Sequence, residues 1–150
     1  MAFKINIGTK EGKTYKLESE APAIIGKELH ETIHGKDISH DLEGYEFEIT
    51  GASDTSGFPS IEDAEGLMLQ GKLLTYGKGM KKRPRKEGKR KRSNPRPRGL
   101  RLRKTVRGKI ISEAMAQINL KVTKEGHKKL ADVFKAEAAE EKKEWIVISL

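Results

Sequence analysis

The chain has 150 residues, of which 35% are hydrophobic and 35% are charged, so it can build one modest hydrophobic core beneath a large polar surface. It contains no cysteine, which excludes disulfides and thiolate metal sites. Its apolar runs all fall short of the roughly 20 residues that a membrane-spanning helix needs. We therefore expect one soluble cytoplasmic domain over residues 1–150, with no membrane partner and no cofactor.

The formal net charge of +9 is distributed unevenly along the chain. Residues 78–109 hold 17 of the 31 Lys and Arg residues but only one of the 22 acids, and the rest of the chain has a net charge of −7. A uniformly basic surface can serve solubility alone. A basic stretch in a mildly acidic body indicates a polyanionic partner.

The N-terminal part of the chain begins with two strand patterns. Residues 3–7 alternate apolar and polar side chains, as a half-buried strand does. Tyr15 and Leu17 continue this alternation after a turn around Gly12. Residues 21–42 have no single period, which leaves room for a short helix.

Four further alternations follow in the middle of the chain. They cover residues 45–49, 67–73, 106–111 and 118–122, and Gly71 interrupts the second as a bulge does. Short strands separated by Gly, Asn or Asp turns predict a mainly β fold. We expect a small barrel-like domain of short antiparallel strands, with a C-terminal helix and a long basic loop.

The C-terminal part changes to a helical period. Over residues 126–143, apolar side chains recur at helical spacing among good helix formers such as Ala, Glu and Lys. The following residues, 145–150, are rich in β-branched side chains. They predict a final strand that pairs back into the sheet.

The basic stretch is expected to form a loop over about residues 78–104. Prolines at 84, 95 and 97 and glycines at 88 and 99 exclude a continuous helix. Dense like charges repel one another, so the free segment should be extended and mobile. Because it contains no aromatic residue, phosphate contacts should dominate over base stacking.

Arginine forks and lysine ammonium groups are suited to phosphate oxygens. We therefore predict that the basic side chains of residues 81–107 bind RNA. The predicted residues are Lys81, Lys82, Arg83, Arg85, Lys86, Lys89, Arg90, Lys91, Arg92, Arg96, Arg98, Arg101, Arg103, Lys104 and Arg107. A solvated charge run or a targeting signal is the alternative interpretation.

Two motifs resemble enzyme sites. Residues 30–34, His-Glu-Thr-Ile-His, match the zinc-protease pattern, in which two histidines one helical turn apart hold the metal. The helix would have to fit between Gly26 and Gly35, and Thr32 and Ile33 weaken it. Residues 8–14 are one residue short of a phosphate-binding loop and continue as a strand, so a hairpin turn explains them better. We expect neither catalysis nor a metal site.

Three segments resemble a known family. They are Gly44-Tyr45 with the strand and turn to Pro59 (GYEFEITGASDTSGFP), residues 101–108 (RLRKTVRG) and residues 117–122 (QINLKV). Their order and spacing are similar to the small-subunit ribosomal protein six family of archaea and eukaryotes. In the first segment, Asp54 and Gly57 suit a tight turn.

The resemblance implies a structural, non-catalytic protein that lies on small-subunit ribosomal RNA beside neighbouring ribosomal proteins, with no small-molecule substrate. Residues 80–95 look like basic sequence beyond the usual family loop, and Ala52 and Ser60 depart from the expected pattern. Another RNA-binding barrel module, such as a translation factor, stays open as an alternative.

Overall fold

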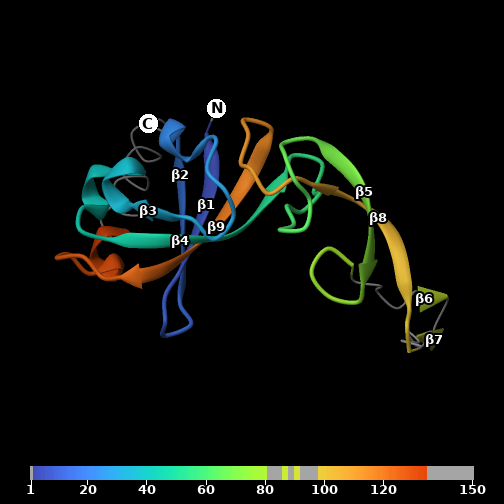
Figure 1. Cartoon of the computed structure of the whole chain (residues 1–150). Coiled ribbons are helices and arrows are strands. Elements are labelled where there is room, and N and C mark those ends of the chain that lie inside the picture. The colour runs from blue at the N-terminus through green and yellow to red at the C-terminus, as the bar shows by residue number, and fades with distance from the viewer. Residues whose placement is uncertain (1, 81–85, 88–89, 92–97, 135–150) are drawn as a thin grey trace, which may run out of the picture.

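The computed structural model describes residues 2–80, 86–87, 90–91 and 98–134, with backbone only for 86–87 and 90–91. Within these ranges the chain is mainly β. One five-stranded sheet has the order β2-β1-β9-β4-β3 (Figure 1). Its strands are β1 (Phe3–Gly8), β2 (Thr14–Ser19), β3 (Thr32–His34), β4 (Glu46–Asp54) and β9 (Met115–Lys124).

The predicted antiparallel pairing is correct for most strands and wrong for one pair. β1 and β2 form the expected hairpin, but β1 lies parallel to β9. The reason is that an alternating pattern specifies which face of a strand is buried and not the direction of its neighbour. β2 and β3 are the outer strands of the sheet, and the described strands do not close into a barrel. The barrel is therefore not confirmed.

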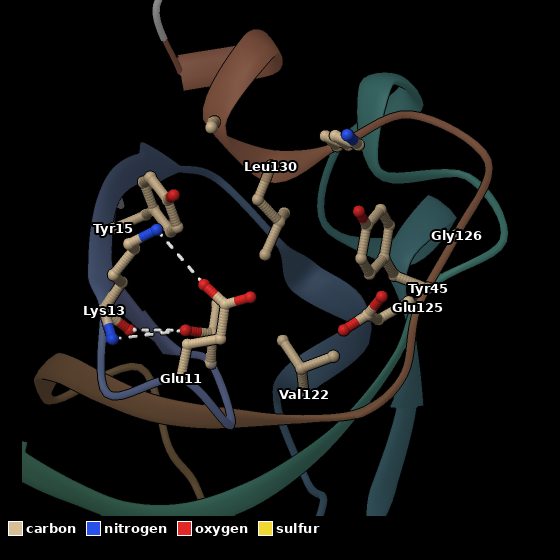
Figure 2. A pocket seen from close by; sticks show the side chains of 11 residues that line it. Glu11, Lys13, Tyr15, Tyr45, Val122, Glu125, Gly126 and Leu130 are labelled. Atoms are coloured by element: carbon tan, nitrogen blue, oxygen red, sulfur yellow. Dashed lines mark hydrogen bonds and ion pairs between the residues drawn. The ribbon is translucent and has the colours of Figure 1, made fainter.

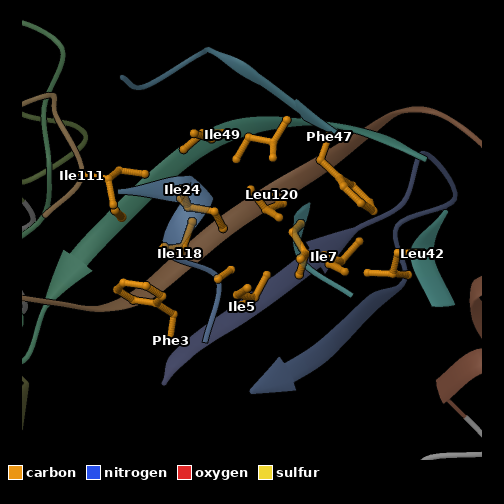
Figure 3. Close-up of a cluster of buried hydrophobic side chains, with 14 of the residues drawn as sticks. Phe3, Ile5, Ile7, Ile24, Leu42, Phe47, Ile49, Ile111, Ile118 and Leu120 are labelled. Atoms are coloured by element: carbon orange, nitrogen blue, oxygen red, sulfur yellow. The ribbon is translucent and has the colours of Figure 1, made fainter. Parts of the chain in front are cut away.

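The main core lies on one face of this sheet. Phe3, Ile5 and Ile7 of β1 pack with Phe47 of β4 and Ile118 of β9, and each is almost fully buried. Figure 3 shows that side chains from β1, β4 and β9 converge there with Ile24, Leu42 and Ile111. Complete burial of one such side chain contributes about 1.5–3 kcal/mol, which makes this cluster the main source of stability.

Residues 21–42 form three short 3₁₀ turns and β3 in place of the short helix left open above. The turns are η1 (Pro22–Ile24), η2 (Gly35–Asp37) and η3 (His40–Leu42). Ile24, Ile33 and Leu42 are buried in the main core, so this irregular segment covers the apolar face of the sheet.

A two-stranded ribbon extends away from the five-stranded sheet (Figure 1). β5 (Leu69–Thr75) and β8 (Arg101–Arg107) pair antiparallel along their whole length. Near its far end lie β6 (Lys86–Glu87) and β7 (Arg90–Lys91), which pair with each other. The ribbon thus presents the basic segment at a distance from the main core.

The ribbon changes two predicted boundaries. The strand expected at residues 106–111 ends at Arg107, and it begins at Arg101, inside the stretch predicted as loop up to residue 104. Residues 101–106 alternate long basic or Thr side chains with Leu102, Lys104 and Val106. This alternation was not recognised as a strand because most of the side chains are basic. Because one face of the ribbon is exposed, it tolerates arginine where a core strand would not.

The C-terminal helix begins later than predicted. The described helical residues are 130–134, whereas residue 126 was expected to start the helix. Gly126 packs against the ring of Tyr45, where an added Cβ would lie 2.5 Å from a ring carbon. Residues 135–143 of the predicted helix and the predicted strand at 145–150 lie outside the described residues.

Candidate nucleic-acid interface

The predicted RNA-binding residues that the structure describes with side chains lie at the end of the basic segment and on β8. Arg98, Arg101, Arg103 and Lys104 are exposed. For Lys86, Arg90 and Lys91 only the backbone is described, in β6 and β7. The other predicted ligands, Lys81, Lys82, Arg83, Arg85, Lys89, Arg92 and Arg96, lie outside the described residues.

The ribbon places like charges opposite each other. Lys72 of β5 is the direct partner of Lys104 of β8. Like charges at directly opposed positions destabilise a strand pair. A polyanion that binds between them removes this repulsion, so the pairing favours a phosphate-bound state.

Arg107 makes contacts within the fold that were not predicted from the sequence. Its Nε and Nη2 donate to Oδ2 of Asp54 at 2.9 and 2.8 Å, and its Nη1 donates to the carbonyl oxygen of Leu67 at 3.2 Å. The Arg107 side chain is 16% exposed and that of Asp54 only 3%. These contacts use three of the five N–H donors of the guanidinium group and fix it within the fold, and its contact with RNA stays a prediction.

The Asp54–Arg107 pair joins the turn after β4 to the end of β8. The hydroxyl of Thr55 donates to the other carboxylate oxygen of Asp54 at 2.8 Å, and Gly57 adopts a φ of 83° in the same turn. The Arg107 guanidinium is the main cause that lowers the pKa of Asp54 below its ordinary value. Two of the three segments that carried the family resemblance therefore meet in one buried ion pair.

The start of the basic segment is also fixed to the body. Met80 is fully buried, and Gly77 and Met80 exchange two backbone hydrogen bonds. Lys78 Nζ lies 3.3 Å from the carbonyl oxygen of Thr50 and 3.5 Å from Glu62 Oε1. The basic residues after Met80 thus leave from a rigid base beside the small apolar cluster of Ile61, Ala64 and Val106.

The histidine motif does not form a zinc site. His30 has a φ of 69°, and Thr32 to His34 form β3, so the two histidines are not one helical turn apart. His30 Nδ1 and Nε2 each lie 2.9 Å from a carboxylate oxygen, of Glu48 and Glu62 respectively. Within the described ranges, no group of three or more His, Cys, Asp or Glu residues is arranged to hold a metal.

These carboxylates predict how His30 titrates. Hydrogen bonds first to Glu48 and then to Glu62 raise the pKa of His30 above its ordinary value. The contacts therefore stabilise the fold fully at pH values below the pKa that His30 has in the unfolded chain. This contribution is lost as the pH rises through the higher pKa that His30 has in the folded protein. We expect an NMR titration of the His30 ring to show a higher midpoint than in the variants Glu48→Gln and Glu62→Gln. Equal midpoints in all three proteins would contradict the contacts.

A pocket of about 340 Å³ lies between the β1–β2 turn and residues 125–131. Figure 2 shows Glu11, Lys13 and Glu125 around it, with Val122, Leu130 and Tyr45 as its apolar wall. Lys13 is paired with Glu11 at 3.1 Å, and the Tyr45 hydroxyl donates to the carbonyl oxygen of Lys128. Mixed charge makes this pocket a poor phosphate site compared with the ribbon.

The architecture defines a class of protein: a β-rich body with a projecting basic ribbon that suits a polyanion. Comparisons with known proteins agree with it. A model of the family described as ribosomal protein S6e matches residues 3–97 and 93–135.

No helix in the described part of the chain is both long and apolar enough to cross a membrane.

Curated relatives cover most of the chain. The small ribosomal subunit protein eS6 of Methanococcus maripaludis strain C6 is 39% identical over 127 residues, which are 84% of this chain and 90% of that protein. The protein of the same name from Methanosphaera stadtmanae is 37% identical over 147 residues, 96% of this chain and 100% of that protein. That from Halobacterium salinarum strain R1 is 35% identical over 143 residues, 93% and 98% of the two chains.

The chain is a ribosomal protein of the small subunit. It belongs to the ribosomal protein S6e family, whose members are structural proteins and not enzymes. The predicted family is therefore confirmed.

Sequence reasoning missed one residue of the basic surface, Lys72, and the partner of Arg107, Asp54. Lys72 lies in a strand that was predicted from its alternating leucines. It becomes part of the basic surface because it is directly opposite Lys104 in the ribbon. Asp54 was assigned to a local turn, yet its carboxylate holds Arg107, 53 residues further along the chain. One signal could have indicated this pair: the first segment of the family pattern contains an acidic residue, Asp54, and the second contains an arginine, Arg107.

Proposed function

We propose that this protein holds small-subunit ribosomal RNA through Lys and Arg contacts to phosphate from residues 81–98 and from Lys72 and Lys104 of the ribbon, in cytoplasmic ribosomes and without catalysis. The observation that supports this most strongly is the direct pairing of Lys72 with Lys104 on a ribbon that continues into the basic segment. An isolated ribbon would not favour that pairing. A phosphate backbone along it supplies the missing counter-charge.

The body of the protein supports a role for the ribbon as a spacer. The main core contains residues of β1, β4 and β9, whereas the exposed residues Arg101, Arg103 and Lys104 lie on β8 of the ribbon. The RNA-binding part can therefore follow the shape of its partner without disturbing the core.

Charge position, and not net charge, should determine RNA affinity. We expect the fourfold variant Lys89→Gln, Arg90→Gln, Lys91→Gln, Arg92→Gln to bind naked small-subunit RNA more weakly than the unmodified protein. The slope of log affinity against log salt should fall by up to roughly 3.6, because each lost phosphate contact removes about 0.9. Filter binding between about 50 and 200 mM salt measures both quantities.

A matched variant controls for net charge. Lys10→Gln, Lys16→Gln, Lys36→Gln and Lys121→Gln remove four exposed lysines from the body of the protein. Both variants therefore lose the same charge, and we expect the second to keep nearly the full salt slope. Equal slopes in the two variants would show that the basic segment is not the RNA-binding site.

Removal of the segment should leave the fold intact. The described members of both apolar clusters come from residues 3–74 and 106–134. We expect that a short Gly-Ser linker in place of residues 81–98 changes the melting temperature by less than about 3 °C, roughly 1 kcal/mol for a domain of this size. Thermal unfolding followed by circular dichroism measures this, and a much larger fall would mean that the segment takes part in the core.

A further inference from the structure

Exposed apolar side chains of the described chain concentrate at β5. Leu67, Met68, Leu69 and Leu73 are 43%, 73%, 45% and 56% exposed, and Ile25, at 38%, is the one large apolar residue exposed outside residues 67–76 in the described ranges. Single exposed apolar residues are ordinary on protein surfaces. A group of them on one element marks an interaction site.

The strand register places arginines beside these leucines. Residues two apart on a strand share a face, and direct cross-strand partners share it too. Leu73 is opposite Arg103, and Thr75 is opposite Arg101. Leu69, Leu73, Arg101 and Arg103 therefore form one face of the ribbon, which we call the Leu–Arg face.

The opposite face of the ribbon has a different composition. It carries Lys72 and Lys104, and Leu74 and Val106 pack there in the small apolar cluster. The ribbon thus separates a lysine face, suited to phosphate, from the Leu–Arg face. One ribbon with two such faces can bind two kinds of partner.

The Leu–Arg face is preorganised. Arg103 Nη1 donates to the carbonyl oxygen of Gly71 at 3.3 Å, and a Cβ added at Gly71 would contact the Arg103 side chain at 3.8 Å. The arginine therefore lies across Gly71, which is between Leu69 and Leu73 on β5. The hydrogen bond to the Gly71 carbonyl oxygen orients the guanidinium group, which can still pair with a carboxylate.

We propose that the Leu–Arg face docks an extended segment of another protein of the small subunit, one in which apolar residues alternate with Asp or Glu. Apolar side chains of this partner would cover Leu69 and Leu73, and its carboxylates would meet Arg101 and Arg103. Ribosomal RNA is the less suitable occupant because phosphate leaves the leucines in water. The proposal rests on the proposed function, since both place the ribbon inside the subunit.

Site-specific photocrosslinking in cells tests this. The photoreactive amino acid p-benzoylphenylalanine is placed at Leu73 in one variant and at Lys104, exposed on the opposite face, in another. Small subunits are washed in high salt after irradiation, and each adduct is digested with protease or ribonuclease. From Leu73 we expect one protein adduct whose linked peptide alternates apolar and acidic residues, and from Lys104 an RNA adduct.

The results separate the two proposals. An RNA adduct from Leu73, no adduct, or a linked peptide without acidic residues would overturn the docking site whatever Lys104 contacts. A Lys104 adduct to protein would count against the proposed function and leave a Leu73 result standing.

Charge reversal provides the second measurement. We expect Arg101→Glu with Arg103→Glu to reduce the Leu73 adduct at least about fivefold per incorporated protein. Lys72→Glu with Lys104→Glu makes the same charge change on the opposite face and should leave that yield unchanged. Equal yields in the two double variants would overturn the role of the arginines.

Discussion

The substitution Asp54→Asn is expected to lower the free energy of unfolding by about 3 kcal/mol, because it leaves the Arg107 guanidinium without its counter-charge in a largely buried site. Urea unfolding followed by circular dichroism measures the difference. The exposed residue Asp63 provides the control, since Asp63→Asn should change stability by less than about 0.5 kcal/mol.

The same pair determines how stability depends on pH. The pKa of Asp54 is lowered in the fold, mainly by Arg107. The contribution of Asp54 to stability is therefore fully present at pH values above the pKa that this carboxyl group has in the unfolded chain. It is lost as the pH falls through the lower pKa that Asp54 has in the folded protein. The difference in stability between the unmodified protein and Asp54→Asn should shrink in acid, and a difference independent of pH would argue against an ion pair.

A double-mutant cycle separates the pair from the rest of the turn. Arg107→Met removes the charge and keeps most of the side-chain length. Because each single change leaves one partner alone, we expect the double variant to be more stable than the sum of the two single losses predicts. Strictly additive losses would show that Asp54 and Arg107 stabilise the fold independently.

Gly108→Ala is expected to destabilise the protein by about 3 kcal/mol, which corresponds to roughly 10 °C in melting temperature. A Cβ at this position would lie 1.7 Å from the carbonyl oxygen of Gly66 and 2.4 Å from its carbonyl carbon. Both atoms are backbone, so the segment before β5 would have to move. Thermal unfolding followed by circular dichroism measures the loss.

Gly77→Ala is the matched control for this steric effect. A Cβ at Gly77 would have no atom within 4 Å, and its φ lies outside the left-handed region. We expect a change below about 0.5 kcal/mol. If the two alanine variants were equally stable, the close approach of Gly108 to Gly66 would not be what makes glycine necessary there.

Much of the fold could be predicted because most strands alternate in burial. β1 and β4 bury alternate residues, and these are the positions that hydrophobicity identified. β8 was only partly found, because arginine at alternate positions was interpreted as loop charge. The parallel β1–β9 pair had no local signal, since it joins residues more than 110 positions apart.

The site was predicted in its charge and not in its geometry. Local charge density identified the basic segment, and the family pattern identified the ribosome. The division of β8 into two faces depends on its register with β5, and the role of Arg107 depends on a carboxylate from a distant turn. Neither the β5–β8 register nor the Asp54–Arg107 ion pair can be inferred from the residues that neighbour them in the sequence.

The central place of β9 has a consequence for the order of events during synthesis. β9 lies between β1 and β4, so the strands made first, β2–β1 and β4–β3, are two separate pieces until residue 124 has left the ribosome. Pairings between distant residues are slow to form. The basic segment is made before β9 and therefore emerges while the sheet is still in two pieces. In the order of synthesis, the basic segment of the nascent chain precedes its completed core.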